Sequence, residues 1–270
     1  MGIIKRKIGI IGAGNMGEAL IKGLLSAGLI AKPWLFCCDK SLSRRKYIQK
    51  KYKISVFPSN DRIAQVCRVI ILAVKPQDMD AALGDIKDKN NKETLIISIA
   101  AGINTKYIQK KLPGARVIRV MPNTPALAGY GVSVIAKGNR TASGDYNLAK
   151  RLFSCIGIVA QVDESLMDVV TAVSGSGPAY FFLLIDSITK AASSMGLSSE
   201  TAQNLIVNTA LGSCVLALQS NQTMDALIKK VASKGGTTEA ALKVFNKKGF
   251  SNMVEQALRQ AAKRSKELSK

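Results

Sequence analysis

Residues 7–17, KIGIIGAGNMG, constrain the fold of this chain most strongly. Residues 8–11 are a short apolar run of the kind that forms a buried parallel strand. The run leads directly into GAGNMG, which fits G-x-G-x-x-G, and a helical pattern follows from Glu18. The motif alone is a weak signal, but its place between a strand and a helix predicts an NAD(P)-binding unit rather than a bare structural turn.

The three glycines of this motif each have a physical role in such a unit. Gly12 makes the tight turn, Gly14 lets the backbone approach a diphosphate, and Gly17 lets the helix pack closely against the strand. The diphosphate then lies on the free N–H groups and the positive dipole end of the helix.

The composition excludes several function classes. The 270 residues suffice for one large or two medium domains. The absence of histidine argues against a Ser-His-Asp hydrolase and a zinc enzyme, so we expect no metal site.

The net charge of +21 is scattered along a chain with 5% aromatic residues and no recognition motif. We therefore expect a basic, solvated surface and no nucleic-acid partner.

Location is predicted from what the chain lacks. No apolar run approaches the roughly 18 residues of a membrane span, and residues 1–6 are too short for a signal peptide. The five cysteines are odd in number, form no C-x-x-C pair and read as buried small hydrophobes in a reducing compartment. We expect a cytoplasmic protein without a membrane partner.

The first 163 residues alternate apolar strands with helices, which predicts a doubly wound parallel sheet. Prolines and small residues end several strands at the carboxyl edge, where ligands bind in open α/β sheets. The expected strands lie at 8–11, 33–39, 54–57, 68–74, 94–102, 116–125, 131–137 and 156–162, the sixth of them broken by prolines, with a polar helix near 141–154.

The end of the second strand carries conflicting signals about the cofactor. Asp39 suits the free 2′-hydroxyl of NADH, whereas Lys40, Arg44 and Arg45 could pair with the 2′-phosphate of NADPH. Residues 41–53 also have the pattern of an exposed cationic helix, which is compatible with either cofactor. We expect NADPH, with NADH possible.

Strands disappear after residue 163, and helices are expected at 178–195, 198–219, 223–232, 237–246 and 250–268. Residues 178–195 and 201–218 are apolar nearly all round, and about one hundred residues of helical hairpins cannot bury them alone. The sequence thus predicts a Rossmann-type domain at 1–163 and an all-α dimerisation domain at 164–270, to which the resemblance described below also assigns substrate binding. We expect a homodimer or a ring of such dimers.

Six motifs follow one another along the chain in a familiar order. They are GAGNMG at 12–17, AVKPQ at 73–77, SIAAG at 98–102, RVMPNTPAL at 119–127, SGSGPAY at 174–180 and GGTT at 235–238. Together they resemble the pyrroline-5-carboxylate reductase family over essentially the whole chain. The resemblance implies reduction of the C=N bond of 1-pyrroline-5-carboxylate to L-proline with hydride from NAD(P)H, the last step of proline biosynthesis.

The resemblance also implies roles for individual residues, and Thr238 is the catalytic candidate, hydrogen-bonding the ring nitrogen of the substrate. The substrate-binding residues are Glu164, Ser233, Gly235, Gly236, Thr237 and Thr238. The cofactor-binding residues are Ile11, Gly12, Ala13, Gly14, Asn15, Met16, Asp39, Lys40, Asn60, Ala73, Val74, Lys75, Pro76, Ala100, Ala101, Met121, Pro122 and Asn123.

The GGTT segment leads into a helix, so its backbone N–H groups form a ready site for the substrate carboxylate. From the residues alone, Thr237 could equally be an N-cap and the glycines a turn. The family usually has proline where this chain has Lys234, which loosens the loop and places a charge near an anionic site. The chain also has Thr223-Met224 in place of His-Pro, and Lys230 in place of Asn or Met.

Two alternative functions stay open. A related imine or hydroxyacid reductase could share this architecture, and Lys190 is the lone candidate for the catalytic lysine of the hydroxyacid class. A non-catalytic NAD(P)-binding regulator is the other alternative, suggested by Lys234. The absence of histidine does not oppose hydride transfer, because the cofactor supplies the chemistry and a fixed hydroxyl suffices to orient the substrate nitrogen.

Overall fold

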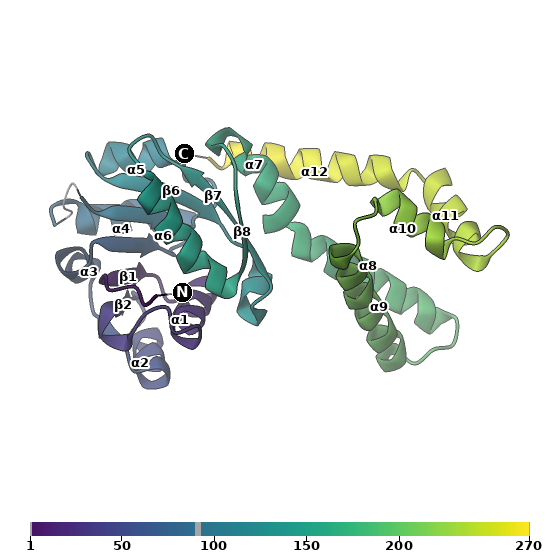
Figure 1. Cartoon of the computed structure of the whole chain (residues 1–270), viewed down its shortest axis with the longest axis horizontal. Coiled ribbons are helices and arrows are strands. Elements are labelled where there is room, and N and C mark those ends of the chain that lie inside the picture. The colour runs from purple at the N-terminus through teal and green to yellow at the C-terminus, as the bar shows by residue number, and fades with distance from the viewer. Residues whose placement is uncertain (1, 90–92, 270) are drawn as a thin grey trace. The chain divides into compact units, whose positions relative to one another are not determined.

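The computed structural model describes residues 2–89 and 93–269. The chain forms two compact units, which we call the sheet unit (Met1–Ser176 with Ala261–Lys270) and the helical unit (Gly177–Gln260) (Figure 1). The sequence placed a single boundary after residue 163. The compact units instead divide after Ser176, and the C-terminal end of the chain belongs to the sheet unit.

The sheet unit contains an eight-stranded sheet in the order β3-β2-β1-β4-β5-β6-β7-β8. Its first six strands are parallel, and β1 lies between β2 and β4 with Ile8 opposite both Leu35 and Val69. The strands are β1 (Ile8–Ile11), β2 (Leu35–Cys38), β3 (Ser55–Phe57), β4 (Val69–Leu72), β5 (Leu95–Ser98), β6 (Arg116–Met121), β7 (Gly131–Lys137) and β8 (Gly157–Gln161).

The doubly wound parallel sheet departs from the parallel arrangement at one edge. Strand β7 is antiparallel to β6, and β8 is parallel to β7. The connection from β6 to β7 is a short 3-10 turn, Thr124–Ala128, followed by Gly129 with φ of 82°. Such a short link reverses the chain, whereas a parallel neighbour requires a crossover of a dozen or more residues.

Helices α1 (Asn15–Ser26), α2 (Leu42–Tyr52), α3 (Asn60–Val66), α4 (Met79–Lys87), α5 (Thr105–Lys111) and α6 (Ser143–Phe153) accompany the sheet. Side chains alternate between its faces, so Ile10 packs with Leu20 of α1 and Phe153 of α6. Ile11 points to the other face and packs with the cluster that contains Leu83 of α4. Both faces of β1 are therefore buried, as the apolar run at 8–11 predicts.

After β8 the described residues form helices and the turns between them, with no further strand. The helices are α7 (Met167–Val170), α8 (Gly177–Ser194), α9 (Ser199–Gln219), α10 (Met224–Val231), α11 (Thr237–Lys247) and α12 (Phe250–Glu267). Large apolar side chains of α8 and α9 stay exposed, including Phe182 at 66% and Leu211 at 60%. Cys214 on α9 is exposed too, unlike the buried cysteines predicted. The helical unit therefore leaves much of its apolar surface uncovered within one chain.

Two helical stretches are long and apolar enough to cross a membrane by length and composition, Glu164–Ser194 and Ser199–Gln219. Their mean hydropathies are 1.4 and 1.3, so the expectation that no apolar run approaches the length of a membrane span is wrong. Polar residues such as Asn204 and Asn208 interrupt these apolar runs. The mean hydropathy of each helix nevertheless stays high enough for a membrane span. Core helices of soluble proteins pass the same test.

Candidate active site

The turn between β1 and α1 brings backbone into contact with backbone. Gly12 has φ of 100°, and its N–H donates to the Cys38 carbonyl at 2.8 Å. A Cβ atom on Gly12 would overlap the Ala73 carbonyl, and one on Gly17 would overlap the Gly12 carbonyl. Both positions therefore require glycine, Gly12 for the turn and Gly17 for the close approach of α1 to the sheet.

Gly14 has a different environment. Its backbone is extended, with φ of −64° and ψ of −171°, and a Cβ atom there would have nothing within 4 Å. It is the N-cap of α1 and supplies no side chain to the first-turn N–H groups. No contact with the described part of the chain requires glycine at this position, and the open space above the helix N-terminus fits a diphosphate.

A groove lies beside Gly14 at the carboxyl end of β2. Asp39 accepts hydrogen bonds from the Ala13 N–H at 2.7 Å and the Ser41 N–H at 2.8 Å, so each carboxylate oxygen holds a backbone amide. The groove is lined by Gly14, Asp39, Ser41, Ser43, Arg44 and Tyr47. Its position corresponds to the adenosine ribose in this topology.

Only one of the three cations predicted for this region lines the groove, and that is Arg44. Lys40 is 82% exposed and forms an ion pair with Asp78 at 2.9 Å. Arg45 donates to the Asp39 carbonyl at 2.8 Å. Asn60, predicted beside the adenosine, donates to Asp85 of α4 at 2.9 Å and is not among the lining residues.

The sequence did not single out Ser41, Ser43 and Tyr47 as lining residues. Ser41 is the N-cap of α2, where its hydroxyl accepts from the Arg44 N–H at 3.3 Å and lies 2.8 Å from the Ser43 hydroxyl. A serine two residues after Asp39, just past the second strand, is the signal that would have found them, because an N-cap places its hydroxyl at the start of the helix.

The remaining cofactor candidates follow neighbouring strands at the same edge of the sheet. Ala73 donates its N–H to the Ile11 carbonyl at 2.8 Å, and Ile99 donates to the Leu72 carbonyl at 3.1 Å. The ends of β1, β4 and β5 are thus held side by side. The candidates located there are Ala73, Val74, Lys75 and Pro76 after β4, Ala100 and Ala101 after β5, and Met121, Pro122 and Asn123 at the end of β6.

Asn123 has both ends of its amide engaged within the sheet unit. Its Oδ1 accepts from the Val132 N–H at 2.8 Å, and its Nδ2 donates to the Ser174 carbonyl at 3.0 Å. The side chain is 8% exposed. Asn123 fixes the loop between β6 and β7. It is a candidate site residue because it lies at the cofactor edge, although its amide is already hydrogen-bonded to the protein.

Glu164 is also held by protein groups. Its carboxylate accepts from the Thr105 N–H at 2.7 Å and the Thr105 hydroxyl at 2.6 Å, and lies 3.8 Å from Arg119 Nη1. Arg119, on β6, is 4% exposed, and burial lowers its pKa against the opposing effect of Glu164 and Asp168. The sequence pointed to neither Thr105 nor Arg119, because both contacts join distant parts of the chain.

The loop before α11 forms a tight turn in the helical unit. The Gly236 N–H donates to the Ser233 carbonyl at 3.0 Å, and Gly235 has φ of 73°, which places Lys234 at the second position of a type II turn. The Gly235 N–H donates to Glu239 Oε2 at 2.5 Å, and this hydrogen bond lowers the pKa of Glu239. Glu239 therefore holds the loop in place, a role the sequence did not suggest.

The N-cap of α11 is Gly236, and no side chain caps this helix. The interpretation of Thr237 as an N-cap is therefore wrong. Thr237 and Thr238 are the first two residues of α11, in the turn where the helix N–H groups lack intrahelical partners. Lys190, the candidate lysine of the hydroxyacid class, is 76% exposed and pairs with Asp186 at 2.7 Å.

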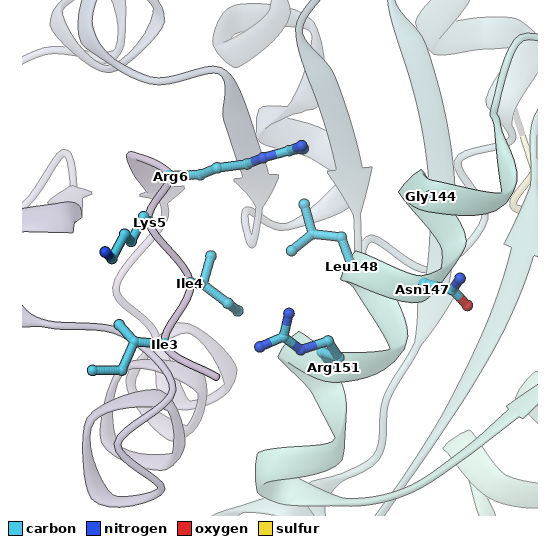
Figure 2. A pocket seen from close by; sticks show the side chains of 8 residues that line it. All are labelled: Ile3, Ile4, Lys5, Arg6, Gly144, Asn147, Leu148 and Arg151. Carbon is cyan, nitrogen blue, oxygen red and sulfur yellow. The ribbon is translucent and has the colours of Figure 1, made fainter. Parts of the chain in front are cut away.

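Two further observations concern parts of the described chain outside these candidates. Residues 2–89 and 93–269 contain no group of three or more His, Cys, Asp or Glu side chains that could hold a metal. A cavity of about 330 Å³ lies between the N-terminal segment and α6, where Ile4 faces Leu148 and Arg151 donates to the Gly2 carbonyl (Figure 2). None of the predicted site residues lines it.

Comparison with known proteins decides the family. Residues 164–268 match the family model for pyrroline-5-carboxylate reductase dimerisation, and residues 7–102 match that for NADP oxidoreductase, coenzyme F420-dependent. The chain is 40% identical to the pyrroline-5-carboxylate reductase of Synechocystis over 98% of each chain. It is 42% identical to that of Pseudomonas aeruginosa over 97% of each. The chain belongs to the pyrroline-5-carboxylate reductase family.

Solved members of this family have the same fold. The reductase from Coxiella burnetii superposes with a TM-score of 0.92 at 34% identity and covers 99% of this chain and 100% of its own. The Plasmodium falciparum enzyme, solved with NADP bound, gives 0.89 at 32% identity and full coverage of both chains. A ketol-acid reductoisomerase at 15% identity and a TM-score of 0.67 shares the fold alone.

Substituting the glycines should separate folding from dinucleotide binding. We expect Gly17→Ala to lower the free energy of unfolding by about 1–3 kcal/mol, because its methyl group overlaps the Gly12 carbonyl. Gly14→Ala meets no protein atom, so its thermal unfolding should match wild type while dinucleotide affinity falls about tenfold or more through crowding of the diphosphate. Thermal denaturation measures the change in stability, and fluorescence titration measures the dinucleotide affinity. Equal destabilisation by the two variants would contradict these roles.

The turn at Lys234 also gives a testable expectation. Proline is favoured at the second position of a type II turn, so Lys234→Pro should stabilise the loop by about 0.4–1 kcal/mol. Hydrogen exchange of the Gly235 and Gly236 amides should slow in the variant. Lys248→Pro, at the C-cap of α11 where the Lys248 N–H bonds to the Val244 carbonyl, is the control and should destabilise. Faster exchange in Lys234→Pro would show that the turn is not of this type.

Proposed function

We propose that this chain reduces the C=N bond of 1-pyrroline-5-carboxylate to L-proline with hydride from NADPH, as the last step of proline biosynthesis. The observation that carries the proposal is the open Gly14 above the uncapped N-terminus of α1, in a chain of this reductase family. A helix N-terminus that is free of side-chain caps and reachable by a diphosphate is what dinucleotide binding requires.

The choice of NADPH is supported by the groove at the end of β2. Arg44 brings a cation to it, and the hydroxyls of Ser41 and Ser43 add donors for a phosphate. The two oxygens of Asp39 already accept backbone N–H groups, so this carboxylate is less available to a ribose diol. NADH remains a possible second cofactor, since the diphosphate site is common to both.

The chain's own residues account for binding and orientation in this reaction. The bound nicotinamide supplies the hydride for the imine carbon. Thr238 donates its hydroxyl hydrogen to the ring nitrogen, while Thr237 and the first-turn amides of α11 hold the substrate carboxylate. Glu239 keeps this loop in shape through its hydrogen bond to Gly235. Lys234 adds a positive charge that favours the anionic substrate.

The rival functions have less support. A hydroxyacid reductase would need its lysine at the reacting centre, and the Lys190 ammonium is exposed and paired with Asp186. A non-catalytic regulator was suggested by Lys234 alone, and the turn at that residue keeps a geometry that lysine can adopt. The experiment for all three is NADPH oxidation with 1-pyrroline-5-carboxylate, with a 2-keto acid and with no substrate.

We expect NADPH oxidation only with 1-pyrroline-5-carboxylate. Its kcat/KM should depend strongly on the Thr238 hydroxyl. Thr238→Ala should lower kcat/KM roughly ten- to a hundredfold, about 1.4–2.7 kcal/mol, because it removes a hydrogen bond that strengthens in the transition state. Thr238→Ser keeps the hydroxyl and should retain much of the activity. NADPH affinity should be unchanged in both. A wild-type kcat/KM in Thr238→Ala would exclude this role, and a parallel fall in NADPH binding would place the residue in the cofactor site.

The proposed assembly is a cytoplasmic homodimer, with a ring of dimers as a further step and neither membrane nor nucleic acid as a partner. Its support is the exposed apolar surface of α8 and α9, which lies within the match to the dimerisation model. A second copy explains why such surface persists in one chain. The two stretches that are apolar enough for a membrane span coincide with these helices, so the dimer accounts for them as well.

A pair of charge substitutions tests the dimer. Leu211 on α9 and Ile3 in the sheet unit are both 60% exposed in the single chain. We expect Leu211→Asp to yield monomers and Ile3→Asp to stay dimeric, because only the first places a charge in the buried interface. Light scattering over a dilution series measures the mass of each. Dimers in both variants, or a wild-type protein that leaves membranes only with detergent, would exclude this interface.

A further inference from the structure

Glu18, in the first turn of α1, has an unusually crowded carboxylate. Its Oε1 accepts from the Tyr52 hydroxyl at 2.7 Å, the Tyr47 hydroxyl at 3.0 Å and Lys51 Nζ at 3.0 Å. Its Oε2 pairs with Arg44 Nη2. All four donors belong to α2, so one side chain of α1 fastens α2 beside the phosphate-binding turn.

Arg44 is fixed by this carboxylate and by two further contacts. Its Nε donates to the Ala13 carbonyl within the glycine turn, and its guanidinium lies 4.8 Å from the centre of the Tyr47 ring. Its Nη1 makes no hydrogen bond within the described part of the chain. The planar group is thus held on three sides, with one nitrogen left over, at the groove where the adenosine ribose is expected.

The charges explain why this arrangement persists at neutral pH. Arg44 and Lys51 both approach Glu18, and without that carboxylate the two cations would repel each other and Arg44 would keep only its contacts with Ala13 and Tyr47. Burial acts to raise the pKa of Glu18, but the hydrogen bonds from Tyr52, Lys51, Arg44 and Tyr47 outweigh it and lower the pKa to about 2. The carboxylate is therefore ionised under all physiological conditions.

We propose that Glu18 is a positioning residue for cofactor choice, holding the Arg44 guanidinium at the groove so that the chain prefers a 2′-phosphorylated dinucleotide. The proposal for Glu18 rests on the proposed function in one respect, which is that the cofactor diphosphate lies at the Gly12–Gly14 turn. A guanidinium that is already oriented loses little side-chain freedom when it binds a phosphate. NADH has no phosphate at this position and gains nothing from the arrangement.

Binding measurements on Glu18→Gln test the proposal, because glutamine keeps the shape and removes the charge. We expect the ratio of NADPH to NADH affinity to fall about tenfold, because Arg44 is then no longer held at the groove. Tenfold corresponds to the weakening of one charge-assisted hydrogen bond to the 2′-phosphate. Adenosine 2′,5′-bisphosphate should lose affinity to the same extent, and AMP should not. These two probes report on the groove without the nicotinamide. A purely structural role would weaken all four ligands equally.

A double-mutant cycle shows whether Glu18 acts through Arg44. In an Arg44→Gln background, Glu18→Gln should leave the affinity ratio unchanged. Glu255→Gln, which removes the same charge from an exposed ion pair with Arg259, is the matched control and should leave all binding unchanged. If Glu18→Gln fails to fold, Glu18→Asp, which keeps the charge but withdraws it from Arg44, takes its place in the same measurements.

Three outcomes would overturn the proposal: an unchanged ratio, an equal loss for all ligands, or tighter NADPH binding in Glu18→Gln. The last would mean that Glu18 merely neutralises Arg44. Failure of the proposed function has a different signature, since wild-type protein would then not oxidise NADPH with 1-pyrroline-5-carboxylate, whatever its affinity for NADPH or NADH. Wild-type NADPH binding and turnover with an unchanged ratio in the variant would reject the role of Glu18 alone.

Discussion

The contact between Gly17 and the Gly12 carbonyl is the constraint on which the site depends. It sets α1 against the end of β1 more closely than any side chain would allow, and so places the helix N-terminus at the carboxyl edge of the sheet. Glu18 comes next in the chain, so the same contact fixes where its carboxylate meets α2. One backbone approach thereby determines both the diphosphate site and the position of the groove beside Gly14.

Carboxylates serve as backbone anchors beside candidate residues in each of the two units, in a chain where cations outnumber them 39 to 18. Asp39 holds the Ala13 N–H, Glu164 holds the Thr105 N–H, and Glu239 holds the Gly235 N–H. Each is a charge-assisted hydrogen bond to a loop that carries candidate site residues. Arg44 itself pairs with Glu18, yet it lines the groove, where an anionic ligand can meet it. The excess positive charge thus has a local use even though most of it is scattered over the surface.

Sequence reasoning recovered what depends on local pattern. The apolar run at 8–11 and the glycine spacing predict β1, the turn and α1, and the family resemblance is confirmed by relatives that match along the whole chain. It missed what depends on distant partners. The contacts of Glu164 with Thr105 and Arg119 leave no local trace, because each joins segments that only the folded sheet brings together. The direction of β7 was missed for a different reason, since strand pattern carries no information on orientation and the short turn before it was overlooked.

The two units differ in how they obtain stability, and this bears on the substrate loop. The sheet unit buries large side chains on both faces of its sheet, including Ile10 and Ile70, whereas α8 and α9 bury little beyond Thr189 and Ala202. Hydrophobic stabilisation scales with the apolar area removed from water, so a single helical unit has little of it. In the proposed dimer, that stabilisation comes from the second copy, and the stability of the helical unit becomes linked to protein concentration. The loop before α11 belongs to this unit, so the geometry of this loop also depends on protein concentration. The Gly12–Gly14 turn does not, because its supporting core lies within one chain.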